Sequence, residues 1–224
     1  ILKRNLDRIM SLTLNMLAFS RQQNIEIELT KLGPLIEECA QLLEGICQTR
    51  QVPLIVDVDS EIPPVPVDPN LVHQVMMNLM TNAVEAVEPK TGAVTVRVDY
   101  HPHGKPGSDG NPRPHPRGSS GAEVEISIID NGPGVPEDRR LWIFEPFNTT
   151  KGMRGTGLGL AVTKRIIEDH HGEIEVFKTA GGGATFRILL PADPAQLIDP
   201  SATAATGRSA LPTPLDFGKQ LFGW

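Results

Sequence analysis

The sequence predicts an α+β fold, a two-layer α/β sandwich in which helices cover one face of a mixed β-sheet. Segments with the 3.6-residue periodicity of helices and segments of alternating apolar residues are interspersed along the chain. Neighbouring strands are often separated only by turn-rich connections, which is typical of hairpins rather than of a regular strand–helix–strand order. At 224 residues the chain is long enough for one such domain with additional segments.

The composition is that of an ordinary soluble protein, with 39% hydrophobic and 21% charged residues. A net charge of −6 argues against a general nucleic-acid-binding surface, because no excess of basic residues is available to neutralise phosphates. The apolar stretches are far shorter than the roughly 20 residues of a membrane-spanning helix, and we expect a cytoplasmic protein. Cys39 and Cys47 fall on one predicted helix, which favours reduced core thiols over a disulfide.

The first part of the chain alternates between helical and strand patterns. Residues 1–22 carry apolar side chains at three- and four-residue steps and predict one long amphipathic helix. We expect it to pack outside the globular body, with an ordinary core helix as the alternative. Residues 26–30 predict a strand, residues 35–49 a helix preceded by Pro34, and residues 52–58 a second strand.

Residues 61–68 contain three prolines and predict a stiff connector. Asp68 is placed to cap the helix that follows over residues 69–87, with Pro69 at its first position. The apolar spacing of this helix predicts an inner face made of Leu71, Val75, Leu79 and Val87.

The second part of the chain predicts two hairpins and one helix. Residues 101–121 are rich in Pro, Gly, Ser and His, so we expect a flexible insertion. A transition-metal site among its histidines is the alternative to the solvated side chains that we favour. The elements follow in the order strand 93–100, strand 122–130, a short helical piece at 137–142, helix 156–170, strand 173–178, strand 184–190 and a tail over 193–224.

Three clusters of residues indicate a phosphate-bearing ligand, although the sequence contains no G-x-x-x-x-G-K-[ST] loop. In the first, Asn78, Asn82 and Glu85 are spaced to share one face of a helix. Buried amides without partners cost about 1–3 kcal/mol each, and their oxygens suit magnesium. The alternative is that these amides bond to neighbouring groups of the protein.

In the second cluster, Asp130 ends an apolar strand and is followed by Gly132 and Gly134. This places a carboxylate at the mouth of a cleft, where it can accept a hydrogen bond from the exocyclic amine of adenine. The motif alone is weak, and a plain strand-to-turn transition is the alternative.

In the third cluster, glycines 155, 157 and 159 precede or open a helix. Unpaired backbone N–H groups and the positive end of the helix dipole make such a start an anion site. Lys151 and Arg154 lie just upstream and add positive charge. A glycine hinge without a ligand is the alternative.

Taken together and in this order, these clusters resemble the catalytic domain of the histidine kinases in the gyrase, heat-shock-chaperone and MutL superfamily. The likeness extends over about residues 29–191, and residues 147–152 look most like sensor kinases of the nitrogen-regulation type. The matching segments are residues 78–85 to the N box, 130–134 to the first glycine box, 144–147 to the F box and 155–159 to the second glycine box.

The resemblance implies a Bergerat-type ATP-binding fold with ATP and Mg²⁺ as ligands. Asn82 would coordinate magnesium, and Asn78 and Glu85 would lie beside the ion and the phosphates. Asp130 would bind the adenine amine, with Thr185 nearby through water. The other implied ATP-binding residues are Gly132 and Gly134 beside the base, Phe144 and Phe147 as anchors of a lid over residues 131–155, Lys151 and Arg154 near the phosphates, and Gly155, Thr156, Gly157, Leu158, Gly159 and Leu160 in the phosphate loop.

The residue at position 78 distinguishes the kinases of this superfamily from its ATP-hydrolysing members. The hydrolysing relatives carry a glutamate four residues before the magnesium asparagine, and here that place holds Asn78. Its neutral amide cannot act as a general base towards water. The resemblance therefore implies a protein-histidine kinase that holds ATP for an outside nucleophile, and not a hydrolase.

Residues 1–25 resemble the second helix of the family's dimerisation hairpin, followed by the catalytic domain over residues 26–192. The first helix should carry an H-E-[LI]-x-N-P motif, which does not occur in this sequence. Since the chain begins at Ile1, we expect a piece of a longer protein that does not autophosphorylate by itself. The resemblance implies a homodimer through the hairpin and a response-regulator receiver domain as partner. A catalytically silent nucleotide-binding module is the alternative.

Overall fold

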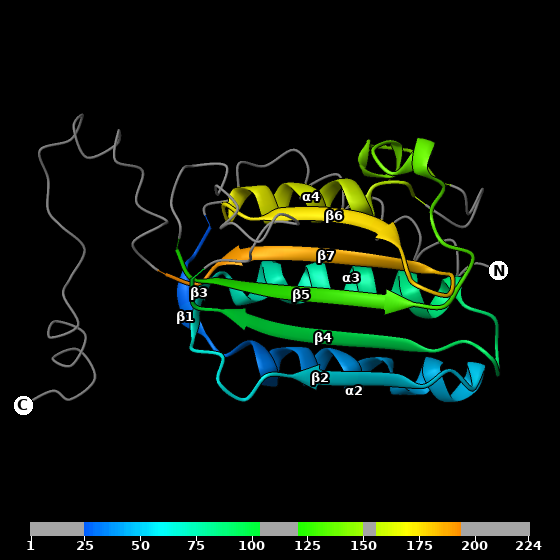
Figure 1. The fold of residues 1–224 in the computed structure, drawn as a ribbon, viewed down its shortest axis with the longest axis horizontal. Helices are drawn as coiled ribbons and strands as arrows, with labels where there is room; N and C mark the ends of the chain where they lie inside the picture. Colours follow the sequence, from blue (N-terminus) through cyan, green and yellow to red (C-terminus); the bar gives the residue numbers. More distant parts are fainter. Residues whose placement is uncertain (1–24, 104–120, 150–155, 194–224) are drawn as a thin grey trace, which may run out of the picture.

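A five-stranded mixed β-sheet forms the centre of the molecule (Figure 1). The computed structural model describes residues 25–103, 121–149 and 156–193. Within the sheet the strand order is β2-β4-β5-β7-β6. The strands are β2 (Leu54–Val58), β4 (Val94–His101), β5 (Glu123–Asp130), β6 (Glu173–Lys178) and β7 (Ala184–Pro191).

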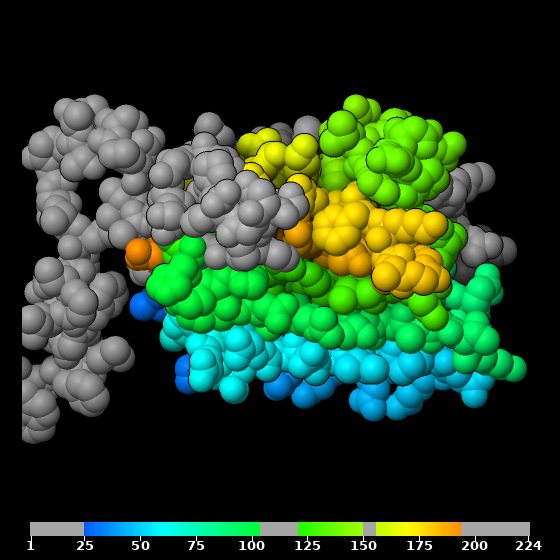
Figure 2. Space-filling view, in the orientation of Figure 1, coloured from blue at the N-terminus to red at the C-terminus, as the bar shows by residue number. Residues whose placement is uncertain are grey.

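Three helices cover one face of this sheet, namely α2 (Leu32–Arg50), α3 (Pro69–Ala86) and α4 (Gly159–Asp169) (Figure 1). In Figure 1 the strands lie in front of α3, and Figure 2 shows the same view in space-filling form. The β2–β4 pair is parallel, and the other pairs of the sheet are antiparallel. The predicted α+β sandwich, with a mixed sheet and helices on one side, is therefore confirmed.

The alternation of side chains between the two faces of each strand explains how the sheet packs against the helices. In β4, β5 and β7 every second side chain points to the helices, and all of these except the half-buried Tyr100 are buried. Burying one such aliphatic side chain contributes about 1.5–3 kcal/mol. The side chains that fill this layer are Val94, Val96, Val98, Val124, Ile126, Ile128, Phe186, Ile188 and Leu190.

Helix α3 lies between α2 and α4, and its buried face is wider than the sequence predicts. Leu71, expected on the inner face, is only half-buried, and Val87 is buried but follows the last helical residue. A helix with neighbours on both sides buries a broader arc than one apolar stripe. The buried residues of α3 are Val72, Val75, Met76, Leu79, Met80, Ala83 and Val84.

The predicted connector over residues 61–68 is not wholly irregular, because it contains strand β3 (Val65–Val67). This strand pairs antiparallel with β1 (Glu28–Thr30) in a separate two-stranded sheet. Pro66 cannot donate a ladder hydrogen bond, but each strand of a two-stranded sheet has one unpaired edge that tolerates proline.

Two predicted helix starts are displaced. Helix α2 begins at Leu32 rather than residue 35, and Pro34 falls in the first turn, where backbone N–H groups have no intrahelical partner. Helix α4 begins at Gly159 rather than residue 156. Gly157 has a φ of +66°, and a left-handed residue cannot belong to a right-handed helix.

The expected short helical piece at 137–142 consists of two 3₁₀-helices, η1 (Glu137–Arg139) and η2 (Trp142–Phe144). The predicted helix over 1–22, most of the insertion at 101–121 and nearly all of the tail lie outside the described residues. In the described part of the chain, no helix is long and apolar enough to cross a membrane.

Both cysteines are free and buried, as expected for core thiols. Burial raises the pKa of the Cys39 thiol to about 11, because the charged thiolate loses its hydration, and the nearby Glu38 adds to this effect. Burial also raises the pKa of Cys47. Both side chains therefore remain neutral thiols at physiological pH.

A buried histidine joins the start of α3 to the end of α4. Asp68 caps α3 and accepts hydrogen bonds from the N–H groups of Asn70 (3.0 Å) and Leu71 (3.1 Å). The N–H of Asp68 itself donates to Nε2 of His170 at 2.9 Å. Since Nε2 accepts, the ring is neutral and carries its hydrogen on Nδ1, which contacts the Ile166 carbonyl oxygen at 2.7 Å.

We expect His170→Ala to lower the free energy of unfolding by about 3 kcal/mol, because it removes two buried hydrogen bonds, leaves the Asp68 N–H unpaired and opens a cavity. Urea unfolding followed by circular dichroism measures the change. His73→Ala is the matched control, since His73 is only half-buried on α3, and we expect a loss below about 1 kcal/mol there. An equal loss in both variants would contradict the assigned role of His170.

Candidate functional site

The first predicted cluster lies where the middle of α3 meets the start of α4. The side-chain Nδ2 of Asn78 donates to the hydroxyl oxygen of Thr163 at 2.9 Å. Its Oδ1 accepts a longer hydrogen bond from Nδ2 of Asn82, at 3.4 Å. Both asparagines are half-buried, whereas Glu85, on the same side of the helix, is exposed. The amides therefore bond to groups of the protein, as the alternative interpretation of this cluster held.

Glycine at position 159 is required for this close approach. A Cβ atom at Gly159 would lie 2.4 Å from Oδ1 of Asn78, far inside normal contact distance. The first residue of α4 thus rests directly on the amide of α3. The start of α4 therefore lies against the asparagine cluster, although the two are separated by more than 70 residues in the sequence.

Asp130, the centre of the second cluster, is a buried carboxylate at the end of β5. It is 4% exposed. Its Oδ1 accepts hydrogen bonds from the N–H groups of Gly132 (2.8 Å) and Ala184 (3.1 Å). No described residue donates to its other oxygen, Oδ2, in the hydrogen bonds of the structure. One oxygen is therefore fixed by the backbone, and the other is the acceptor that a ligand amine would meet.

Burial raises the pKa of Asp130 above its usual value, because the charged form loses hydration, and the two backbone hydrogen bonds partly offset this effect. A hydrogen-bond donor on a ligand would stabilise the charged form further. A partly desolvated carboxylate of this kind is a typical feature of a binding site.

Close backbone packing surrounds Asp130. A Cβ atom at Gly132 would lie 3.0 Å from Oδ1 of Asp130 and 3.1 Å from the carbonyl oxygen of Ala86, the last residue of α3. Gly134 has a φ of +75°, and a Cβ atom there would lie 2.7 Å from the carbonyl oxygen of Gly183. The first glycine box is therefore wedged between the end of α3 and the β6–β7 turn.

Thr185 lies on β7, the strand that neighbours β5. It pairs with Ile129, the residue before Asp130, and it is buried. Its hydroxyl is 2.9 Å from that of Thr179 across the β6–β7 hairpin. Because successive side chains of a strand point to opposite faces, Thr185 shares its face with Ile129, whereas Asp130 points to the helix side with Ile128 and Phe186. The implied role of Thr185 near the adenine remains a prediction.

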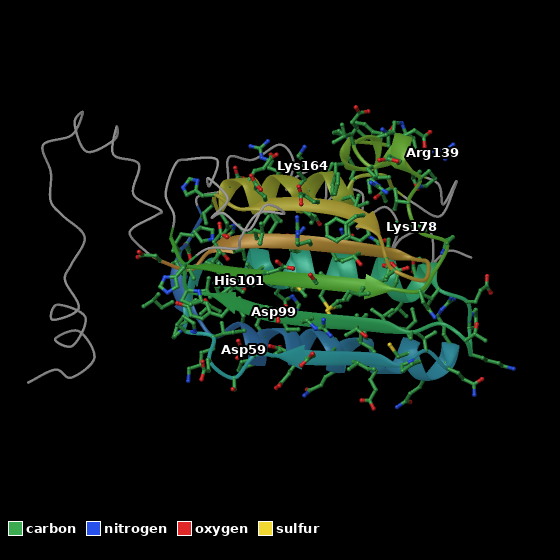
Figure 3. All side chains as sticks on the ribbon, in the orientation of Figure 1. Asp59, Asp99, His101, Arg139, Lys164 and Lys178 are labelled. Atoms are coloured by element: carbon green, nitrogen blue, oxygen red, sulfur yellow. The ribbon has the colours of Figure 1, made fainter. Side chains whose placement is uncertain are left out.

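The F box contacts both layers of the fold. Phe144 is buried and packs edge-on against Phe186 of β7, with ring centroids 6.4 Å apart. Lys164 of α4, labelled in Figure 3, places its Nζ 5.9 Å from the centroid of the Phe144 ring. The Phe147 side chain is 66% exposed. Its N–H donates to the Gly157 carbonyl oxygen at 2.8 Å, which joins the F box to the second glycine box through the backbone.

Gly157 is confined by this contact. A Cβ atom there would lie 2.4 Å from the carbonyl carbon of Phe147, and its φ of +66° disfavours other residues. Thr156 accepts a hydrogen bond from the Leu158 N–H at 3.3 Å, and Leu158 is buried. Leu160 is half-buried against the core. Lys151, Arg154 and Gly155 lie outside the described residues, and their roles remain predictions.

The sequence did not point to three residues that shape this site. Thr163 and Ala184 bond to predicted site residues from distant parts of the chain, and Gly183 packs on the Asp130 backbone. A glycine run marks Gly183 as a turn, but no local pattern marks the other two.

Two surface grooves, of about 530 and 500 Å³, lie elsewhere on the molecule. One runs between α2 and the start of β2, and the other lies between the starts of α2 and α3. Their lining contains none of the predicted site residues, so neither groove defines the candidate site.

The described residues fit a nucleotide with its metal ion. Gly132 and Gly159 allow the backbone to pack directly against Asp130 and Asn78, and the buried Asp130 carboxylate offers an acceptor. The amide oxygen of Asn82 is a hard ligand of the kind that magnesium prefers, and Asn78 and Glu85 are spaced to share its face of α3.

Comparisons with known proteins agree with this arrangement. Residues 67–194, more than half of the chain, match the family of histidine kinase-, DNA gyrase B- and HSP90-like ATPases. The signal transduction histidine-protein kinase AtoS of Escherichia coli K12 is 32% identical over 194 residues, covering 87% of this chain and 29% of AtoS. The sensory histidine kinase/phosphatase NtrB of Rhizobium leguminosarum is 33% identical over 205 residues, covering 91% of this chain and 51% of NtrB.

Solved structures show the same fold. The catalytic domain of histidine kinase ThkA aligns with a TM-score of 0.61 at 28% identity, covering 78% of this chain and 99% of that domain. Full-length ShkA in complex with AMPPNP aligns with a TM-score of 0.68 at 25% identity, covering 83% of this chain and 36% of ShkA.

The chain thus spans between about a third and a half of the curated relatives named above. Because kinases of several kinds match at similar identity, the nitrogen-regulation subgroup remains a prediction. The family match covers the N box, the glycine boxes and the F box together. The chain belongs to the family of histidine kinase-, DNA gyrase B- and HSP90-like ATPases, as the catalytic domain of a sensor histidine kinase.

Proposed function

We propose that this chain binds Mg²⁺-ATP and transfers the γ-phosphate to a histidine on a dimerisation helix, from which it passes to a response-regulator aspartate. The observation that carries the proposal is the buried Asp130 carboxylate, held by two backbone N–H groups beside Gly132. It lies at the same end of the sheet as the end of α3, since Ala86 borders Gly132. The carboxylate that would accept a hydrogen bond from the adenine base and the amides that would lie near the phosphates of ATP are thus close together.

Asp130 would select adenine. Its free carboxylate oxygen accepts from the exocyclic amine of adenine, whereas guanine presents a carbonyl oxygen at the corresponding position. The backbone hydrogen bonds to Oδ1 fix the orientation of the carboxylate, so little conformational freedom is lost on binding. Gly132 allows the backbone after Asp130 to pack closely against the end of α3, which keeps the Gly132 N–H on Oδ1 of the carboxylate.

Asn82 would coordinate the metal ion, with Asn78 and Glu85 beside the ion, and the start of α4 would hold the phosphates. Bound Mg²⁺ neutralises charge on the β- and γ-phosphates. The N–H groups at the start of α4 and its dipole favour the remaining negative charge. Asn78 supplies no general base that could activate water. The γ-phosphate would therefore be transferred to the histidine nucleophile and not hydrolysed.

We also propose the partners that this chemistry requires. A histidine on a helical hairpin must reach the bound nucleotide, and a homodimer through that hairpin would present it. A receiver domain would then accept the phosphoryl group. The kinase ThkA has been solved in complex with a response regulator protein, TrrA. A cytoplasmic location would give access to ATP.

The first test is calorimetry of this chain with ATP and Mg²⁺, followed by incubation with γ-labelled ATP and a hairpin fragment that carries the H-E-[LI]-x-N-P motif. We expect ATP binding, and acid-labile, base-stable label on the fragment. In Asn82→Ala we expect the label to fall by at least about a hundredfold, because charge compensation at the phosphates is lost. Asn70→Ala, at the opposite end of α3, is the control and should label normally.

The outcomes separate the alternatives. ATP binding without transfer to the histidine fragment would favour the catalytically silent module. Phosphate release with water alone would favour a hydrolase of the same family. Failure to bind ATP would contradict all three.

A further inference from the structure

Thr163 is a polar residue in the apolar interface between α3 and α4. Its side chain is 1% exposed. The other buried residues of α4 are Ala161, Val162, Ile166 and Ile167. A hydroxyl in such surroundings costs stability unless it is hydrogen-bonded. Its side-chain partner in the described structure is Asn78, whose Nδ2 donates to it at 2.9 Å.

This hydrogen bond holds the Asn78 amide in place, with its nitrogen on Thr163. An amide has one donor group and one acceptor oxygen, so placing Nδ2 on Thr163 directs Oδ1 to the other side. On that side, Oδ1 borders Gly159 and accepts from Nδ2 of Asn82 at 3.4 Å. Thr163, Asn78 and Asn82 thus form a chain of hydrogen bonds that runs from α4 along α3.

We propose that Thr163 is a positioning residue for metal-dependent nucleotide binding, a proposal that rests on the function proposed above. Its hydroxyl orients Asn78, and Asn78 in turn engages the nitrogen of Asn82. Because the nitrogen of Asn82 faces Asn78, its oxygen is directed away from Asn78. An amide oxygen is the atom that would bind magnesium. Residues that orient metal ligands through a hydrogen bond change metal affinity by 10–100-fold when they are replaced.

The chain of hydrogen bonds also couples two parts of the site. Asn78 and Asn82 belong to α3, whereas Thr163 and Gly159 belong to α4, whose start forms the phosphate loop. Displacement of α4 would remove the acceptor for Asn78 and release the Asn82 amide. The phosphate loop and the metal ligands are therefore set together rather than separately.

Thr163→Val tests this role because valine has nearly the shape of threonine and lacks the hydroxyl. The dissociation constant for ATP is measured by calorimetry in excess Mg²⁺ and again in EDTA. We expect the value with Mg²⁺ to rise about tenfold, as for other residues that orient metal ligands, and the value in EDTA to stay within about twofold. Thr163→Ser keeps the hydroxyl and should restore the wild-type value with Mg²⁺.

Thr95→Val is the matched control, since Thr95 lies on β4 on the face of the sheet away from the helices. It should bind ATP like the wild type under both conditions. Thr163→Ala removes the same hydroxyl and carries the test if the valine variant does not fold by circular dichroism.

Two outcomes would overturn the proposal for Thr163. Equal weakening with and without Mg²⁺ would mean that Thr163 supports the site as a whole, and unchanged binding under both conditions would mean that it orients nothing. A wild-type chain that binds no ATP would instead overturn the proposed function.

Discussion

Asp130→Asn should weaken ATP binding by about a hundredfold, equivalent to about 3 kcal/mol, while the fold stays intact. The amide oxygen of asparagine can still accept from the N–H groups of Gly132 and Ala184. Its NH₂ group, however, replaces the acceptor Oδ2 and places a donor against the donor of the adenine amine. The charge-assisted hydrogen bond is lost, and two polar groups remain unpaired in a buried site.

The stability of the free protein should not fall with this substitution. Burial disfavours the charged carboxylate, as the raised pKa of Asp130 shows. A neutral amide avoids that desolvation cost and keeps the backbone hydrogen bonds, so the melting temperature should stay the same or rise. A binding defect in a protein of undiminished stability would identify Asp130 as a ligand contact rather than a structural residue.

Calorimetry with ATP and GTP measures the effect, and Asp57→Asn is the control. Asp57 is exposed on β2 and pairs with Arg97 at 3.3 Å on the protein surface. The wild type should prefer ATP to GTP. Asp130→Asn should narrow that preference, because its NH₂ group can donate to the guanine carbonyl oxygen. Binding of ATP within about threefold of the wild type would show that Asp130 does not contact the base.

Much of the sheet could be predicted because its signal is local. In β4 the alternation of Val94, Val96 and Val98 with polar residues reports directly which side chains face the helices. The cap of α3 is similarly local, since Asp68 and Pro69 are adjacent to the helix that they start. These features require no knowledge of distant parts of the chain.

The missed features depend on contacts between distant segments. Strand β3 exists because β1, more than 30 residues away, supplies its hydrogen-bond partner, and three prolines in the stretch suggested otherwise. The start of α4 shifted because Gly157 adopts a left-handed conformation fixed by the Phe147 backbone. No periodicity within residues 155–160 contains that information.

The candidate site shows the same division. The sequence marks Asn78, Asn82 and Asp130 by their unusual polarity in apolar surroundings. It does not reveal the groups that orient them, because Thr163 is 85 residues from Asn78 and Ala184 is 54 residues from Asp130. Polar residues in apolar segments are thus recognisable from sequence, whereas their hydrogen-bond partners become visible only in the fold.

Gly183→Ala should destabilise the domain by about 4 kcal/mol or more, because a backbone contact leaves no space for a side chain. A Cβ atom at Gly183 would lie 1.9 Å from the carbonyl oxygen of Asp130. The carbonyl oxygen belongs to the backbone and the position of the Cβ atom is fixed by it, so rotation of a side chain cannot relieve the collision. The Gly183 φ of +90° adds a conformational cost for alanine.

The β6–β7 turn contains its own control for this substitution. Gly181 has the same φ of +90°, yet nothing lies within 4 Å of a Cβ atom placed there. Gly181→Ala therefore incurs only the conformational cost, on the order of 1–2 kcal/mol. Urea unfolding of the two variants separates the collision from the backbone conformation, and the difference of about 2–3 kcal/mol belongs to the contact with Asp130.

The same contact should make Gly183→Ala defective in ATP binding even where it remains folded. To admit the new methyl group, the Asp130 carbonyl must move, and the carboxylate that we assign to the adenine moves with it. Its hydrogen bond from Ala184, the residue next to Gly183, is then lengthened or lost. Calorimetry at low temperature, where the variant is folded, should show weaker ATP binding than in Gly181→Ala. Equal affinities and equal stabilities in the two variants would show that the turn and the base-binding carboxylate are independent.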